Sequence, residues 1–366
     1  MINVLFKISD ILSLIIVYQA VHFSVLLIFD KSKRLEIRWL LWMFMLTIGL
    51  NFLFILIMNQ GIQTRQLGPA LGLIYGPLFF LFGEFLIDRA RRLSLNDLLH
   101  FVPSILVLLV LLVQDSFLMR STVNLIVTIA VGTHLAIYLF STHARILAFQ
   151  RELKDYVSNT LDMDLAWLKL MIRLFGLLLI LIVLQAGLFN SMTLQNAVLV
   201  GLQLFVLIFM SLLYYKGFLH LARWAKIPYP SENLAEDKNE KYASNKLDKD
   251  EIQKLADKVV AFIEKDKPYK NDKLSLNDVS LSAGIDARSL SQVINVHFET
   301  NFYDFINGYR IQAAIAQLQT SSDKRINEIM YSVGFNSKSS FNTAFKKRTG
   351  QTPSEFRKTQ QKGSNT

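Results

Sequence analysis

The sequence contains no cysteine among its 366 residues. This absence excludes disulfide bonds, thiolate zinc sites, iron–sulfur clusters and cysteine nucleophiles. The six histidines are scattered and form no His-Glu-x-x-His pair, and neither a Gly-x-Ser-x-Gly motif nor a glycine-rich phosphate loop occurs. We therefore predict no enzymatic activity, no metal and no cofactor.

Long apolar runs dominate residues 1–217, whereas the rest of the chain is polar and rich in lysine. A helix that crosses a membrane needs roughly 20 mainly apolar residues. Seven runs are candidate spans, although the fourth is short and contains Pro103: 8–29, 39–59, 68–88, 98–113, 122–141, 168–189 and 196–217. The sequence predicts an all-α chain that begins with a polytopic bundle of about seven membrane helices.

Basic residues are unevenly divided between the loops of this bundle. Loops that follow odd-numbered spans hold ten: Lys31, Lys33, Arg34, Arg38, Arg89, Arg91, Arg92, Arg145, Arg151 and Lys154. The N-terminal segment and the other loops hold three: Lys7, Arg65 and Arg120. Because an excess of Lys and Arg marks the cytoplasmic side, we expect the N-terminus outside and the C-terminal half in the cytoplasm.

Polar side chains also occur within the predicted spans: His22, Asn51, Glu84, Asn124, His134, Gln185 and Gln203. Polar groups in a bilayer are costly, so these residues indicate a ligand pocket or polar network, or else hydrogen bonds between helices. Glu84 lies about one turn from Asp88 and the following arginines, so an ion pair is the simpler interpretation there.

Glycines four residues apart, Gly68, Gly72 and Gly76, precede Pro77 in the third span. They allow either a hinge or close packing of helices, and we favour close packing.

Residues 218–248 have the composition of a linker, with Pro228 and Pro230 before a charged, polar run. A flexible chain of this length would span roughly 30 Å, and we expect disorder around 231–245. Helical periodicity returns at Asp250, which predicts a soluble domain at 249–360 and a tail at 361–366.

One pattern occurs twice in the soluble half, at 274–294 and 325–345. Each copy predicts a short helix, a turn with glycine, and a second helix capped by Asp286 or Asn336. Four apolar residues in i,i+4 pairs are expected to pack inward: Leu290 with Ile294, and Phe341 with Phe345. This is the pattern of a helix-turn-helix, whose second helix enters the DNA major groove. A helix at about 302–318 joins the two copies.

Further residues match a known family: Asn301-Phe302, Tyr309-Arg310-Ile311, Ile329, Val333-Gly334-Phe335, Ser337, Ser340-Phe341, Phe345-Lys346, Gly350, Thr352-Pro353 and Phe356-Arg357. Because of these matches, residues 250–360 resemble the DNA-binding domain of the AraC/XylS family of transcription regulators. The membrane half is similar in architecture to members in which a membrane sensor replaces the soluble ligand domain. The resemblance implies two recognition helices in successive major grooves about 34 Å apart. It also implies a bacterial protein of the inner (cytoplasmic) membrane and a homodimer.

By position in the pattern, the residues expected to read bases are Arg288, Ser291, Gln292, Lys338, Ser339, Asn342 and Thr343. Those expected to contact phosphates are Asn295, Lys346, Lys347 and Arg348. For the three basic residues, the alternative is a solvated helix end favoured by the helix dipole.

The sequence departs from the family pattern at three positions. Ser280 and Met330 replace a small alanine where the two helices of each motif cross. Glu299 stands where the second copy has Gly350, and a positive φ there would cost roughly 1 kcal/mol.

We therefore predict a membrane-anchored, sequence-specific regulator of transcription. Its partners would be double-stranded DNA, the lipid bilayer and an unidentified small-molecule or membrane signal. The alternative is a membrane transporter or receptor whose C-terminal domain is accessory, or is released by proteolysis within 231–245.

Overall fold

The computed structural model describes residues 2–29, 35–60, 68–88, 91–113, 121–160, 165–188, 192–224, 247–320 and 324–363. These residues are helical and contain no strand, only an isolated β-bridge between Val157 and Ser275, which confirms the all-α class. The chain divides into two compact units. The first comprises Met1–Ala148 and Leu165–Lys226, and the second comprises Phe149–Asp164 and Ile227–Thr366.

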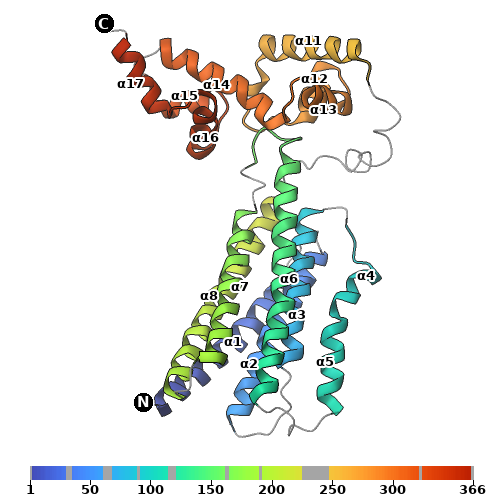
Figure 1. The fold of residues 1–366 in the computed structure, drawn as a ribbon, viewed down its shortest axis with the longest axis vertical. Helices are drawn as coiled ribbons and strands as arrows, with labels where there is room; N and C mark the ends of the chain where they lie inside the picture. The colour runs from blue at the N-terminus through green and yellow to red at the C-terminus, as the bar shows by residue number, and fades with distance from the viewer. Residues whose placement is uncertain are drawn as a thin grey trace. The chain divides into compact units, whose positions relative to one another are not determined.

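The first unit is a bundle of long helices (Figure 1). Its helices are α1 (Ile2–Phe29), α2 (Leu35–Asn59), α3 (Gly68–Ile87), α4 (Leu95–Leu98), η1 (Leu99–Phe101), α5 (Val102–Val113), α6 (Ser121–Leu153), α7 (Ala166–Leu188) and α8 (Met192–Trp224). Helix α1 packs against α2 and α8, α2 against α3, α3 against α5, and α7 against α8.

Five helices among the described residues are long and apolar enough to cross a membrane: Lys7–Phe29, Leu35–Asn59, Gly68–Ile87, Val127–Leu153 and Asn196–Gly217. They overlap the first, second, third, fifth and seventh predicted spans. The fourth prediction corresponds to a shorter apolar helix at Leu95–Leu111. Helix α7 covers most of the sixth, but the side chains of its last turns lie outside the described residues. The total of seven spans stays a prediction.

The glycine-lined face of α3 packs closely against α6. A Cβ added to Gly72 would lie 2.8 Å from Cγ1 of Val131, and one added to Gly76 would lie 2.8 Å from Cδ2 of Tyr138. Helix α3 continues through Pro77 to Ile87. The close-packing interpretation therefore describes these glycines.

Helix α8 extends to Trp224, seven residues beyond the predicted end of the last span. The predicted disorder at 231–245 lies outside the described residues.

The second unit contains α11 (Lys249–Asp266), η4 (Pro268–Lys270), α12 (Leu276–Ala283), α13 (Ala287–Val296), α14 (Phe302–Thr320), α15 (Ile326–Ser332), α16 (Lys338–Thr349) and α17 (Pro353–Gly363). Helix α14 is the predicted connecting helix. Its first half, with Phe302 and Ile306, belongs to the core of the first motif. Its second half, with Ile311 and Leu318, belongs to the core of the second. The two motifs are therefore built on one shared helix (Figure 1).

Residues 149–164 also belong to the second unit, although no pattern in the sequence predicts it. The side chain of Tyr156 packs against the core of the first motif. Three backbone hydrogen bonds of 2.8–3.1 Å attach this stretch, donated by Ser158 to Leu274, by Leu276 to Tyr156 and by Tyr303 to Lys154.

The glycines in the two motif turns are expected to differ in their tolerance of a side chain. Gly284 has φ +59, and an added Cβ would meet only Nζ of Lys258, at 3.7 Å. Gly334 has φ +96, and a Cβ there would lie 2.3 Å from the carbonyl oxygen of Tyr269. We expect Gly284→Ala to lower the free energy of unfolding by about 1 kcal/mol through backbone strain. Gly334→Ala should cost about 3 kcal/mol or more because backbone must move.

The measurement is native-state hydrogen exchange of core amides in the second unit. Equal losses of protection in the two variants would contradict this prediction.

Candidate nucleic-acid interface

The first motif folds as its sequence predicts. Oδ1 of Asp286 accepts hydrogen bonds from the backbone N–H groups of Arg288 and Ser289, at 3.0 and 3.1 Å, and so caps α13. Leu290 and Ile294 are buried on the inner face of that helix. Helices α12 and α13 therefore form a helix-turn-helix with α13 in the second position.

In the second motif, the prediction that Asn336 caps the second helix is wrong. Oγ of Ser337 accepts the hydrogen bond from the backbone N–H of Ser340, at 3.1 Å, and α16 begins at Lys338. The capping residue follows the turn glycine by three positions here and by two in the first motif. Aligning the copies on their glycines therefore placed the cap one residue early.

The three departures from the family pattern fit the fold in two ways: Ser280 and Met330 are buried, and Glu299 adopts a strained backbone. Met330 is buried, and so is Ser280, whose hydroxyl donates to the carbonyl of Ile285 at 2.7 Å. Gly350 ends α16 with φ +76, and Glu299 has φ +50 after α13. Glu299 therefore has the positive φ whose cost was considered from its alignment with Gly350.

The outer face of α16 is open to solvent. The predicted base-reading residues of this helix are all exposed: Lys338, Ser339, Asn342 and Thr343. The opposite face is anchored by Phe341 and Phe345, which are 1 % and 0 % exposed. This anchoring leaves amide, hydroxyl and ammonium groups free to meet base edges.

The corresponding face of α13 is more covered. Arg288, Ser291 and Gln292 are partly buried, whereas Asn295 is exposed and its amide lies 3.4 Å from Oγ of Ser291. Thus the two predicted recognition helices differ in how much polar surface they offer.

The basic end of α16 is exposed at Lys346, Lys347 and Arg348. Nζ of Lys347 forms an ion pair with Oδ2 of Asp304 on α14, at 2.9 Å. A surface pair of this kind contributes about 0–1 kcal/mol, so a phosphate could exchange for the carboxylate.

A buried arginine joins the parts of this unit. Arg310, on α14, is 1 % exposed. Its five N–H groups make five hydrogen bonds of 2.7–3.0 Å, to the carbonyls of Tyr269, Asn271 and Ser158, Oδ1 of Asn307 and Oγ of Ser158. Its guanidinium also lies 5.6 Å from the ring centroid of Phe335 in the second motif. Burial lowers the pKa of Arg310 to about 10, so the group stays charged at neutral pH.

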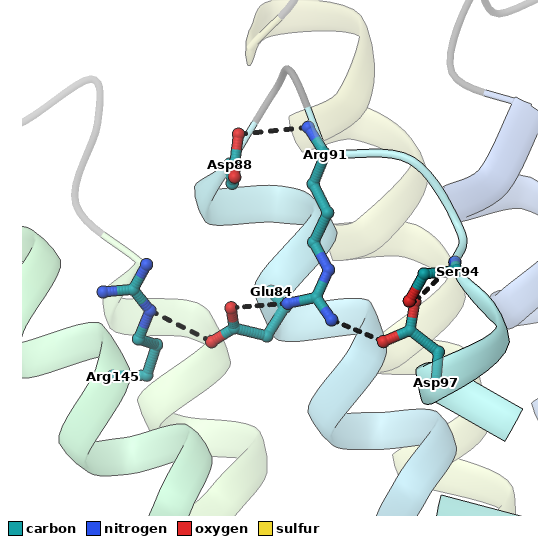
Figure 2. Close-up of polar contacts among 6 residues, drawn as sticks. All are labelled: Glu84, Asp88, Arg91, Ser94, Asp97 and Arg145. Carbon is teal, nitrogen blue, oxygen red and sulfur yellow. Dashed lines mark hydrogen bonds and ion pairs between the residues drawn. The ribbon is translucent and has the colours of Figure 1, made fainter. Parts of the chain in front are cut away.

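In the bundle, Glu84 is held by two arginines (Figure 2). Its carboxylate lies 2.9 Å from Nη1 of Arg91 and 3.1 Å from Nε of Arg145 on α6. Arg91 also pairs with Asp97 of α4, and its backbone N–H donates to Asp88. Glu84 therefore forms the ion pairs that the simpler interpretation predicts, and the network ties α3 to α4 and α6.

The other polar residues of the predicted spans are dispersed. Gln203 donates from Nε2 to Ser9 and Ser13, which joins α8 to α1. The amide of Asn51 donates to Tyr75, and the ring of His134 packs on Tyr138. His22 is exposed in the bundle, whereas the side chains of Asn124 and Gln185 lie outside the described residues. Among the described side chains, the printed contacts of Asn51, His134 and Gln203 join them to different neighbours.

Among the described residues, no group of three or more acidic or histidine side chains is placed to hold a metal ion.

Comparison with protein families matches residues 279–359 to a family described as a helix-turn-helix domain. Neither curated proteins nor solved structures gave a match. The C-terminal part is thus a helix-turn-helix domain of the kind found in DNA-binding regulators.

No pattern in the sequence indicates the role of Ser158. It lies more than 110 residues from Leu274, the residue it bonds. Tyr156 and Val157, two apolar residues in a polar stretch, were the available signal, and two residues are too few to establish a period.

Replacing Glu299 with glycine should stabilise the first motif. Removing the strain of its positive φ is expected to raise the free energy of unfolding by about 0.5–1 kcal/mol. Glu264→Gly, inside α11, is the matched control and should lower it by about 1 kcal/mol. Hydrogen-exchange protection of α13 measures both changes, and a loss of protection in the Glu299 variant would count against the strain.

Proposed function

We propose that this protein is a membrane-anchored regulator of transcription that binds double-stranded DNA in a sequence-specific way through α13 and α16. The observation that carries the proposal is the exposed polar face of α16, held outward by two buried phenylalanines in a helix-turn-helix domain. Lys338, Ser339, Asn342 and Thr343 would read bases in one groove, and Arg288, Ser291 and Gln292 in the next. Asn295, Lys346, Lys347 and Arg348 would contact phosphates.

The membrane half supports anchoring by its five long apolar helices. Together with the bias of basic residues, these favour a multi-pass protein of the bacterial inner membrane with its DNA-binding unit in the cytoplasm. The bundle would sense a small molecule or a membrane signal, and the regulator would act as a homodimer. The alternatives, a transporter with an accessory domain and a domain released within 231–245, predict DNA binding that is independent of the bundle.

DNA binding is tested with the full chain in lipid nanodiscs and duplexes that it selects from a random pool. Affinity should fall steeply with salt. Lys338→Ala should reduce discrimination between selected and random duplexes by about 1–3 kcal/mol. Lys346→Ala should reduce the salt slope by about one without changing discrimination.

Lys254→Ala, an exposed lysine of α11, is the matched control and should change neither quantity. A wild-type chain that binds no duplex at low salt would refute the proposed function.

Orientation can be tested because the chain has no native cysteine. A single cysteine introduced at Gln63 should react in intact cells with a membrane-impermeant maleimide. One introduced at Ser32 should react only after the cells are permeabilised. The reverse pattern of labelling would overturn the orientation.

A further inference from the structure

The stretch between α6 and α7 contributes to the interior of the DNA-binding unit. Ser158 is 1 % exposed, and its hydroxyl donates to the carbonyl of Leu274 at 2.7 Å. Its Oγ and its carbonyl oxygen accept two of the five hydrogen bonds donated by Arg310. The contact is therefore buried and specific in its partners.

This stretch is also continuous with a candidate membrane span. Helix α6 runs from Ser121 to Leu153 without interruption, and the boundary between the two units falls within it, after Ala148. Lys154, the residue after the helix, accepts the backbone hydrogen bond from Tyr303 near the start of α14. Because α6 is continuous across this boundary, a shift along its axis would also move Lys154, which is bonded to α14.

We propose that residues 154–158 are the positioning segment through which the bundle sets the spacing of the two recognition helices. The proposal rests on the proposed DNA binding. The segment acts through Arg310, which also bonds the carbonyls of Tyr269 and Asn271 ahead of the first motif. The ring of Phe335, in the turn of the second motif, lies against the same guanidinium.

The physical basis is the cost of leaving a buried donor unpaired. Withdrawing Ser158 would strand two N–H groups of a charged, buried side chain. Arg310 must then find other acceptors or move, and its remaining partners lie ahead of the first motif, on α14 and in the turn of the second motif. A displaced segment therefore changes how one motif is held against the other, while α12–α13 and α15–α16 each keep their own cores.

The same geometry bears on release by proteolysis. A single cut within 231–245 would leave residues 154–158 covalently joined to the bundle through α6 and hydrogen-bonded to the unit. Such a cut alone would not free a complete DNA-binding unit.

The first experiment measures affinity against half-site separation. Full-length wild type in nanodiscs and its Ser158→Ala variant are titrated with selected duplexes. In these duplexes the two half-sites, one for α13 and one for α16 of the same chain, are moved apart or together by one to four base pairs. Wild type should prefer one separation. Ser158→Ala should lose about tenfold in affinity at that separation, consistent with lost buried hydrogen bonds, and little at the others.

A general loss of folding would instead lower affinity equally at every separation, and that outcome would overturn the proposal. So would an unchanged preference in the variant. If wild type selects no duplex at all, the proposed function fails first, and this inference fails with it.

The second experiment restores the contact by another bond. Val157 and Ser275 are opposite each other in an antiparallel bridge. Opposed residues of such a pair usually have Cα atoms about 4.5–5.5 Å apart, which is within the range that a disulfide spans. In the triple variant Val157→Cys, Ser275→Cys and Ser158→Ala, oxidation should restore the wild-type separation preference and reduction should remove it. The two single-cysteine variants are controls that should not respond to oxidant. A preference that does not change on oxidation, with the disulfide verified by mass, counts against the proposal.

The third experiment tests the connection to the bundle. Two alanines inserted after Ala148 rotate the end of α6 by about 200° and advance it by about 3 Å. This insertion should change the preferred separation, whereas the same two alanines inserted after Leu234 should not. An identical preference in both insertion variants would show that the segment is a static brace.

Discussion

Arg310 is the constraint on which the C-terminal unit depends. Burying a guanidinium costs several kcal/mol unless its donors are all paired, and here five N–H groups find five oxygens. Those oxygens come from α14 itself, from the residues before α12 and from the stretch after α6. Each of these segments supplies acceptors that the buried arginine cannot obtain from water, so Arg310 links their positions to one another. Gly334 belongs to the same arrangement, since its missing side chain lets the second turn approach Tyr269 and Arg310.

Local features of this unit were accessible from the sequence because their causes are local. The cap at Asp286, the inward pairs on α13 and α16, and the strained φ at Glu299 all depend on neighbours within one turn. The error at Asn336 came from assuming equal turn lengths in the two copies. The contacts of Ser158 could not be predicted from the sequence, because a short polar stretch carries no periodic signal and its partners are distant in the chain.

In the N-terminal half, hydropathy predicted where the long helices lie more readily than it predicted their polar contacts. Apolar length identified the long helices, and glycine spacing predicted that α3 packs closely against another helix, which in the structure is α6. Pairing was harder to foresee for Asn51 and Gln203, because a polar residue in an apolar run does not reveal which helix faces it. In the described residues these groups mostly bind helices to one another. The arginines that pair with Glu84 also contribute to the charge bias used for orientation, which counts basic residues and not net charge.

Residues 149–164 belong to the same compact unit as the helix-turn-helix domain, so that unit is not one continuous stretch of the chain. A recombination event at the linker after α8 would bring in a foreign helix-turn-helix domain without the stretch that supplies acceptors to its arginine. The new domain would meet a loop shaped for another surface. Exchange between related chains should therefore preserve the loop and the domain together, because a chimera joined at the linker alone would keep the loop of one protein and the domain of another.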